Sequence, residues 1–245
     1  MNRTRKLIAL MLAVLLLLAT LPTAGLADSY KVETLKLNQW YKFQDYDEHM
    51  TIYRLKVSGE TVLNYSWKNG HDAYLSVYRD KACEDRVAST RIEETTGSSA
   101  FVLYSGTYYI ILSDDSERTK IKFSTKNATT VNKPNYCLGK AITVKSGKKV
   151  EIAQTTKSNY TRWYRINLPK TKTITLSFTG NDYDYFLNSN FTLYDRNLNS
   201  LYCTERKGAY VTQGLQPKGT YYLRIDACSE SGLLETGKYL SFSWK

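Results

Sequence analysis

The chain has 245 residues, 21 of them tyrosine, and a formal net charge of +11 at pH 7. Acidic residues separate the basic ones and no dense Lys/Arg run occurs, which argues against a nucleic-acid-binding protein. Only two histidines are present, and no metalloprotease motif, serine-hydrolase elbow or phosphate-binding glycine loop is visible, which argues against an enzyme.

Residues 1–27 have the pattern of a bacterial secretory signal peptide. Arg3, Arg5 and Lys6 precede an apolar run over 7–21, which ends at Pro22 and is followed by small residues at 25–27. The run is about 15 residues long and a membrane span needs roughly 20, so a membrane anchor is the less favoured alternative and we expect no stable membrane insertion. Cleavage would remove three positive charges, from +11 to +8. We expect a secreted protein that is extracellular or associated with the cell surface.

The remainder of the chain carries one pattern twice. Residues 105–112 resemble 218–225, and residues 52–57 resemble 163–168. A repeat of roughly 110 residues is domain-sized and far longer than a solenoid repeat. We therefore predict a first domain over 28–126, a polar linker over 127–138 and a second domain over 139–245.

Alternating side chains predict β-strands in both copies. Tyr53, Leu55 and Val57 would face inward, with Arg54 and Lys56 facing outward, and residues 164–168 repeat this pattern. Each copy has about seven or eight such segments with turn residues between them. This predicts an all-β chain of two tandem antiparallel β-sandwich (jelly-roll-like) domains.

A Gly-Thr-Tyr-Tyr sequence occurs in both copies, beginning at Gly106 and Gly219. We expect each glycine to lie in a tight turn with a positive φ. The first tyrosine of each pair would face inward and the second outward. Outward positions Tyr109 and Ile111 would then form a more apolar patch than their counterparts in the second copy.

All four cysteines, Cys83, Cys137, Cys203 and Cys228, follow the signal sequence. An even count in an exported chain favours disulfides. We favour Cys203 with Cys228, which leaves Cys83 and Cys137 to join the two copies. Free thiols are the alternative; a zinc site is disfavoured because no C-x₂-C pair or nearby histidine occurs.

The order of several motifs resembles the bacterial pre-peptidase C-terminal domain. These motifs are the turn Lys145-Ser146-Gly147-Lys148, the Trp-Tyr-Arg-Ile sequence over 163–166, the apolar segment 191–195 and the Pro-Lys-Gly-Thr-Tyr-Tyr sequence that begins at Pro217. The resemblance covers essentially all of the chain after the signal, twice. It implies a non-catalytic β-sandwich of the kind appended to secreted proteases, related to the collagen-binding domains of clostridial collagenases. The chain departs from that arrangement because no protease domain accompanies the two copies.

Some members of that family bind calcium, so three groups of acidic and amide residues are candidate sites. Clustered oxygens in a loop can hold calcium, but the same residues are common in turns. We expect no cofactor, with calcium as the alternative. The candidate residues are Asp45, Asp47 and Glu48, then Asp114, Asp115 and Glu117, then Asn181, Asp182 and Asp184.

The abundant aromatic residues favour a binding module for an extracellular polymer, either a glycan or a matrix protein. The alternative is a structural or interaction protein that docks onto another exported protein or protease, through the patch around Tyr109 and Ile111. A glycosidase would need converging paired carboxylates, which sequence alone leaves open. The ligand, domain orientation and oligomeric state also stay open. We expect four aromatic side chains to be exposed and two more to lie in a loop. The candidate ligand-binding residues are the exposed Trp40, Tyr41, Tyr160 and Trp163, and then Tyr183 and Tyr185.

Overall fold

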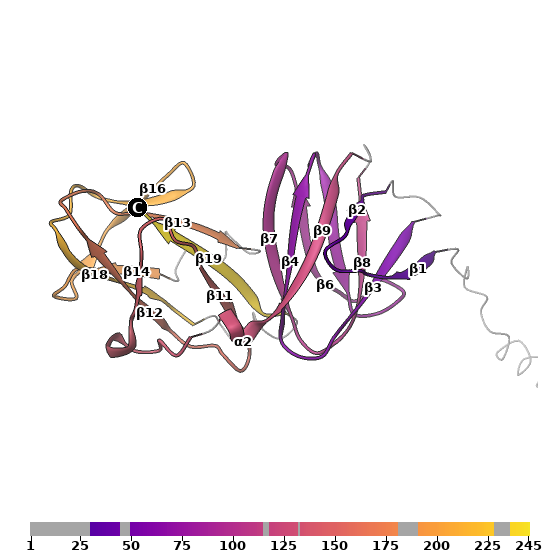
Figure 1. Cartoon of the computed structure of the whole chain (residues 1–245), viewed down its shortest axis with the longest axis horizontal. Coiled ribbons are helices and arrows are strands. Elements are labelled where there is room, and N and C mark those ends of the chain that lie inside the picture. Colours follow the sequence, from indigo (N-terminus) through magenta and orange to yellow (C-terminus); the bar gives the residue numbers. More distant parts are fainter. Residues whose placement is uncertain (1–29, 45–49, 115–117, 132, 181–190, 228–235) are drawn as a thin grey trace, which may run out of the picture.

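The computed structural model describes residues 30–44, 50–114, 118–131, 133–180, 191–227 and 236–245. The predicted signal peptide over 1–27 lies outside these residues. The described chain is nearly all β-structure and forms two β-sandwiches that lie side by side along the long axis (Figure 1). The predicted fold class is confirmed, while the domain bounds stay a prediction.

The first sandwich consists of a five-stranded sheet in the order β1-β3-β8-β5-β6 and a four-stranded sheet in the order β2-β9-β4-β7. The strands are β1 (Lys31–Thr34), β2 (Trp40–Lys42), β3 (Thr51–Val57), β4 (Thr61–Lys68), β5 (Ala73–Tyr78), β6 (Arg86–Ile92), β7 (Thr96–Leu103), β8 (Gly106–Ser113) and β9 (Lys120–Asn127).

The second sandwich consists of two five-stranded sheets, β10-β12-β18-β14-β15 and β11-β19-β13-β17-β16. Helix α2 (Ala128–Val131) and the 3₁₀ helix η1 (Leu138–Lys140) come before it. The strands are β10 (Ile142–Val144), β11 (Val150–Gln154), β12 (Arg162–Leu168), β13 (Thr175–Gly180), β14 (Phe191–Tyr194), β15 (Ser200–Leu201), β16 (Cys203–Arg206), β17 (Ala209–Thr212), β18 (Gly219–Ile225) and β19 (Lys238–Trp244).

The two sandwiches begin in the same way. β1 pairs parallel with β3, and β10 pairs parallel with β12, whereas the other ladders between the named strands are antiparallel. After this parallel edge strand the chain crosses to the other sheet, where β2 pairs with β9 and β11 pairs with β19. Each sandwich therefore has one edge at which consecutive strands belong to opposite sheets.

Alternation along the strands places the core as predicted. Tyr53, Leu55 and Val57 are buried while Arg54 and Lys56 are exposed. Each sandwich has its own cluster of buried apolar side chains, because each pair of sheets turns its apolar faces toward one another.

The expectation of positive φ at Gly106 and Gly219 is wrong, since both are the first residues of extended strands and neither has a positive φ. The repeated motif instead closes a turn through its first tyrosine. The Tyr108 hydroxyl donates to the carbonyl oxygen of Tyr104 at 3.2 Å, and the Tyr221 hydroxyl donates to that of Pro217 at 2.7 Å. A tyrosine that bonds back to the backbone fixes the entry into the strand.

A small apolar cluster joins the two sandwiches, and it contains Val62, Ala100, Val102, Ala128, Ala153 and Tyr239. Glu151 on β11 lies at its margin and accepts hydrogen bonds from the Lys126 ammonium and the Tyr239 hydroxyl, each at 2.6 Å. The backbone N–H of Gly237 also donates to the carbonyl oxygen of Val102 at 2.9 Å. This joint holds the outer face of β4 and β7 against β11 and β19.

The disulfide predicted between Cys83 and Cys137 is wrong, because both are free thiols. Cys83 lies in the β5–β6 turn and packs near Ile111, whereas Cys137 is exposed just before η1, which precedes the second sandwich. Cys203 is also a free thiol. The predicted pairing of Cys203 with Cys228 is therefore wrong as well, although Cys228 itself lies outside the described residues.

Candidate functional site

An exposed tryptophan surrounded by lysines lies on the outer face of the four-stranded sheet. In the register of β2, β9 and β4, Trp40 pairs with Lys122, and Lys42 pairs with Lys120, which pairs in turn with Lys68. Residues directly opposite on neighbouring strands point to the same face of a sheet. The alternate row, which contains Tyr41, faces the core. We call Trp40, Lys42, Lys68, Lys120 and Lys122 the Trp40 surface.

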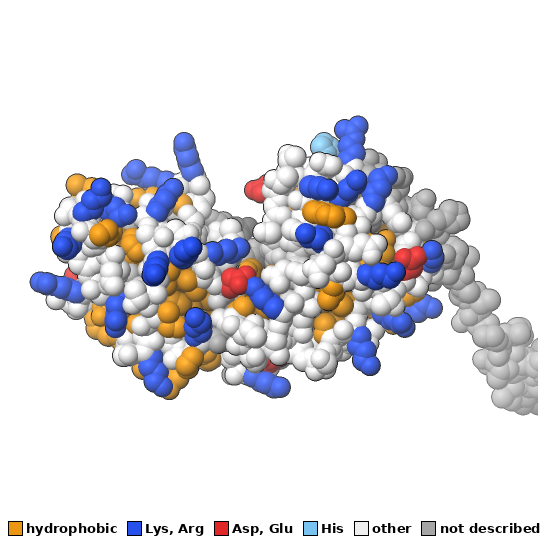
Figure 2. Space-filling model, viewed as in Figure 1, with side chains coloured by type: hydrophobic (Ala, Val, Ile, Leu, Met, Phe, Trp, Pro, Cys, Tyr) orange, Lys and Arg blue, Asp and Glu red, His pale blue; other side chains and the backbone are white. Residues whose placement is uncertain are grey.

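The indole ring of Trp40 is flanked by two ammonium groups. Lys68 Nζ lies 4.4 Å and Lys122 Nζ 5.2 Å from the ring centroid, within the range of cation–π attraction. The Trp40 side chain is nevertheless 39% exposed, so part of the ring stays open to solvent. Figure 2 shows Lys and Arg side chains gathered around hydrophobic atoms over the first sandwich where β2 and β9 lie.

A polar hollow of about 190 Å³ continues from this surface toward the joint. Lys122 belongs to both, and Lys149 and Glu151 of the second sandwich line the far end. Between them the hollow is lined by hydroxyl and amide side chains. These are Asn64, Ser66, Ser98, Ser99 and Ser124.

A second group of aromatic and cationic side chains lies on the outer face of β12, β18 and β14. Trp163 stacks on Tyr194 with ring centroids 5.7 Å apart. Arg224 lies 5.8 Å from the Tyr194 ring, and Arg165 lies 5.9 Å from the Tyr222 ring. We call Trp163, Arg165, Tyr194, Tyr222 and Arg224 the Trp163 surface. Arg224 also pairs with Asp226 at 2.9 Å, so part of its charge is balanced.

The predicted aromatic residues do not form one site. Trp40 and Trp163 lie on outer faces of different sandwiches. The expectation that Tyr41 is exposed is wrong, because its ring packs 4.7 Å from Tyr53 in the core and its hydroxyl bonds to the backbone of Lys36. Adjacent residues of a strand point to opposite faces, so Trp40 and Tyr41 could not both face outward.

Tyr160 is half-buried and has an evident structural role. Its hydroxyl donates to the carbonyl oxygen of Lys133 at 3.1 Å, and the guanidinium of the buried Arg162 lies 4.4 Å from its ring. Tyr183 and Tyr185 lie outside the described residues, so their roles stay predictions.

The apolar patch predicted around Tyr109 and Ile111 is not an open surface. Ile111 is buried beside Met50 and Ile52, and the half-buried Val32 of β1 and Tyr109 pack against this cluster. The parallel edge strand β1 therefore helps to cover the surface that the docking hypothesis needed.

The predicted calcium residues are only partly within the described chain. Asp114 is buried and accepts a hydrogen bond from the backbone N–H of Thr119 at 2.9 Å, as a turn residue does. The other members of the three groups lie outside. Within the ranges that the structure describes, no group of three or more His, Cys, Asp and Glu side chains is placed to hold a metal ion. His71 is exposed, and His49 lies outside the described residues.

Sequence reasoning did not single out the lysines of the Trp40 surface. The alternation around Lys120 and Lys122 marks both as outward positions, which is the signal that was available. Only strand pairing shows that they lie beside Trp40 and Lys68. Among the described residues, no helix combines the length and apolar character of a membrane span.

Comparisons with known proteins give partial likenesses of fold. No family model matches the chain, and no curated protein matches it. A solved structure of the pre-peptidase C-terminal domain of collagenase from Bacillus anthracis matches 46% of this chain and 99% of its own length, with 16% identity and a TM-score of 0.34. PliG of Aeromonas hydrophila, a periplasmic inhibitor of g-type lysozyme, matches 41% of this chain and all of its own length, with 12% identity and a TM-score of 0.30.

Proposed function

We propose that this chain is a secreted, non-catalytic module that binds an anionic extracellular polysaccharide on the Trp40 surface. The observation that carries the proposal is the exposed indole of Trp40 with the Lys68 and Lys122 ammonium groups 4.4 and 5.2 Å from its centre. The signal-like N-terminus and the net positive charge support an exported protein that is attracted to acidic polymers.

The chemistry of the Trp40 surface matches a sugar acid. A pyranose ring presents an apolar face that can lie on the open part of the indole. A carboxylate, sulfate or phosphate on that sugar would then meet the flanking ammonium groups. Lys42 and Lys120, one pleat repeat further along the sheet, extend the positive charge beyond a single sugar unit.

The polar hollow supports a polymer rather than a single sugar. It begins at Lys122 and offers serine hydroxyls and an asparagine amide, which hydrogen-bond readily to sugar hydroxyls. A chain that leaves the Trp40 surface along this hollow reaches Lys149 on the second sandwich.

The Trp163 surface would act as a second, weaker contact. Its arginines and aromatic rings offer the same chemistry, but Trp163 is stacked on Tyr194 and Arg224 is paired with Asp226. Two linked contacts on one polymer raise the overall affinity through effective concentration.

The decisive experiment compares residues 28–245 on polygalacturonate and on its methyl-esterified form, which has the same backbone without the charges. We expect saturable binding to the acidic polymer that weakens as salt rises. Trp40→Ala should reduce affinity about tenfold, because the sugar loses its stacking partner and the Lys68 and Lys122 ammonium groups lose the cation–π contacts that position them. Equal binding to both polymers would contradict the anionic ligand.

Matched variants separate the site from general charge and folding. The double variant Lys68→Ala with Lys122→Ala should weaken binding. Lys170→Ala removes one positive charge from an exposed position outside the Trp40 surface and should change binding little. Tyr202→Ala is the aromatic control, since that side chain is 71% exposed. If folded Trp40 and lysine variants bind like the wild type, the Trp40 surface is not the site, and immobilised collagen tests the matrix-protein alternative.

A further inference from the structure

The open edge of the second sandwich contains a pocket of about 420 Å³. It lies between β10 and β11, the consecutive strands that belong to opposite sheets. The end of α2, with Thr130 and Val131, and Lys133 after it close one side. Its size falls within the range of small-molecule sites. Apolar side chains form its inner wall: Val131, Ile142, Val144, Val150 and Tyr164.

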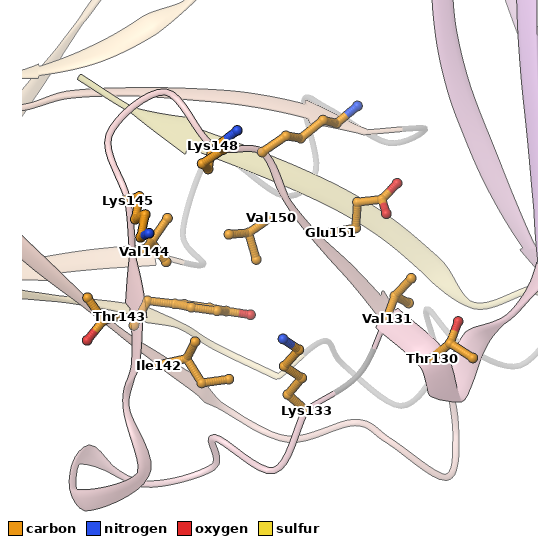
Figure 3. Close-up of a pocket in the computed structure, with 12 residues that line it drawn as sticks. Thr130, Val131, Lys133, Ile142, Thr143, Val144, Lys145, Lys148, Val150 and Glu151 are labelled. Carbon is orange, nitrogen blue, oxygen red and sulfur yellow. The ribbon is translucent and has the colours of Figure 1, made fainter.

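Lysines surround this apolar wall. Lys133, Lys145, Lys148 and Lys149 all line the pocket and all are exposed. Glu151 is the only carboxylate among the lining residues, and Lys126 and Tyr239 already bond to it. In Figure 3, Lys133 extends into the space in front of Ile142 and Val150, while Glu151 points away from it. The pocket thus combines an apolar interior with a net positive rim.

The first sandwich shows what fits at the equivalent edge. A turn with positive φ comes before each edge, at Asn38 in the first sandwich and at Gly147 in the second. The backbone N–H of Asn38 donates to the carbonyl oxygen of Phe123, and that of Gly147 donates to the carbonyl oxygen of Trp244, each at 2.7 Å. With these turns superposed in sequence, Tyr41 corresponds to Val150. The neighbours correspond too: Leu35 to Val144, Lys36 to Lys145 and Tyr53 to Tyr164.

In the first sandwich this position is filled by a phenol ring. Tyr41 packs 4.7 Å from Tyr53, and its hydroxyl bonds to the backbone N–H and carbonyl of Lys36. In the second sandwich the counterpart Val150 has no ring, while the counterparts of the surrounding residues remain and line the pocket. Burial raises the pKa of Tyr164 to about 12, so its hydroxyl stays neutral at physiological pH.

We infer that this pocket binds a small aromatic carboxylate, whose ring takes the place that the Tyr41 ring occupies in the first sandwich and whose acid group meets the lysine rim. The apolar wall accounts for the ring, and the excess of lysines accounts for the negative charge. This site is separate from the Trp40 surface, so either can fail without the other.

The test uses 4-hydroxyphenylacetate as the probe on residues 28–245, observed through the methyl NMR signals of Val144, Val150 and Ile142. For a ligand of this size we expect saturable shifts with a dissociation constant on the order of 1 mM. The neutral 4-hydroxyphenylacetamide should bind several-fold more weakly, because it has the ring without the charge. Absence of methyl shifts, or equal affinity for acid and amide, would overturn the inference.

Two variants test the ring position and the lysine rim separately. Val150→Tyr should restore the first sandwich's ring, keep the fold and abolish probe binding. Lys133→Ala together with Lys145→Ala should weaken probe binding without closing the pocket. If Val150→Tyr does not fold, the lysine variant still decides. Unchanged probe affinity in a folded Val150→Tyr or lysine variant would show that the probe binds elsewhere. Trp40→Ala should leave probe binding unchanged.

Discussion

Replacement of Glu151 by Gln tests how the two sandwiches are held together. The Glu151 carboxylate accepts one hydrogen bond from Lys126 Nζ and one from the Tyr239 hydroxyl, both at 2.6 Å. The Lys126 and Glu151 side chains are 29% and 32% exposed, so solvent screens the pair only in part. Gln keeps the shape of the side chain but removes its charge.

The expected cost lies between the values for buried and exposed pairs. Hydrogen bonds to a charged group contribute roughly 1.5–3 kcal/mol when buried, and exposed ion pairs contribute about 0–1 kcal/mol. We therefore expect Glu151→Gln to lower the free energy of unfolding by about 1–2 kcal/mol at pH 7. For a chain of this size that lowers the midpoint of thermal unfolding by roughly 2–8 °C.

The effect has a defined pH dependence. Burial acts to raise the pKa of Glu151, but the bonds from Lys126 and Tyr239 outweigh it and hold that pKa below its ordinary value of 4.5. Since the folded-state pKa is the lower one, the stabilisation is fully present above pH 4.5 and is lost as the pH falls through the folded-state value. The difference between wild type and variant should therefore disappear in acid.

Thermal unfolding followed by circular dichroism at pH 7 and pH 3 measures both effects. Glu33→Gln is the matched control, because its pair with Lys31 is exposed and should contribute little. The reasoning is refuted if Glu151→Gln unfolds at the wild-type temperature at pH 7, or if the difference persists unchanged at pH 3.

Two further predictions address the repeated motif and the thiols. Tyr221→Phe removes a hydroxyl that donates to a backbone carbonyl at 2.7 Å, and should lower the free energy of unfolding in urea by about 1 kcal/mol. The control Tyr222→Phe, on the outer face, should lower it less. Equal losses would contradict the role assigned to the Tyr221 hydroxyl. Burial raises the pKa of Cys83 and Cys203 to about 11, so iodoacetamide at pH 8 should label exposed Cys137 before either of them. Faster labelling of Cys83, or a Cys83–Cys137 crosslink in peptide mapping, would contradict the structure.

Several features of the fold were predictable because they depend on local alternation. Tyr53, Leu55 and Val57 face the core as their spacing indicates, and the outward position of Trp163 follows from the same rule. The structural role of the first tyrosine in the Gly-Thr-Tyr-Tyr sequence was not predictable in this way. The tyrosine hydroxyl bonds to a carbonyl four residues earlier, and a motif shows the residue types but not that contact.

The candidate site was predicted only in part. The sequence suggested Trp40 as an exposed aromatic residue, but the lysines beside it come from β4 and β9, which are distant along the chain. The prediction that Tyr41 is exposed was wrong, because the sequence does not show which face of the edge strand β2 meets the other sheet of the sandwich.

The sequence by itself determined the all-β character, the internal repeat and the inward phase of the central strands, because these depend on side-chain spacing within a few residues. The tertiary structure decided everything that depends on pairing between distant strands. It brought Lys68 and Lys122 to Trp40, covered Ile111 and kept Cys83 away from Cys137. It also left a pocket beside Val150, since a cavity arises from the packing of several elements and no single segment encodes it.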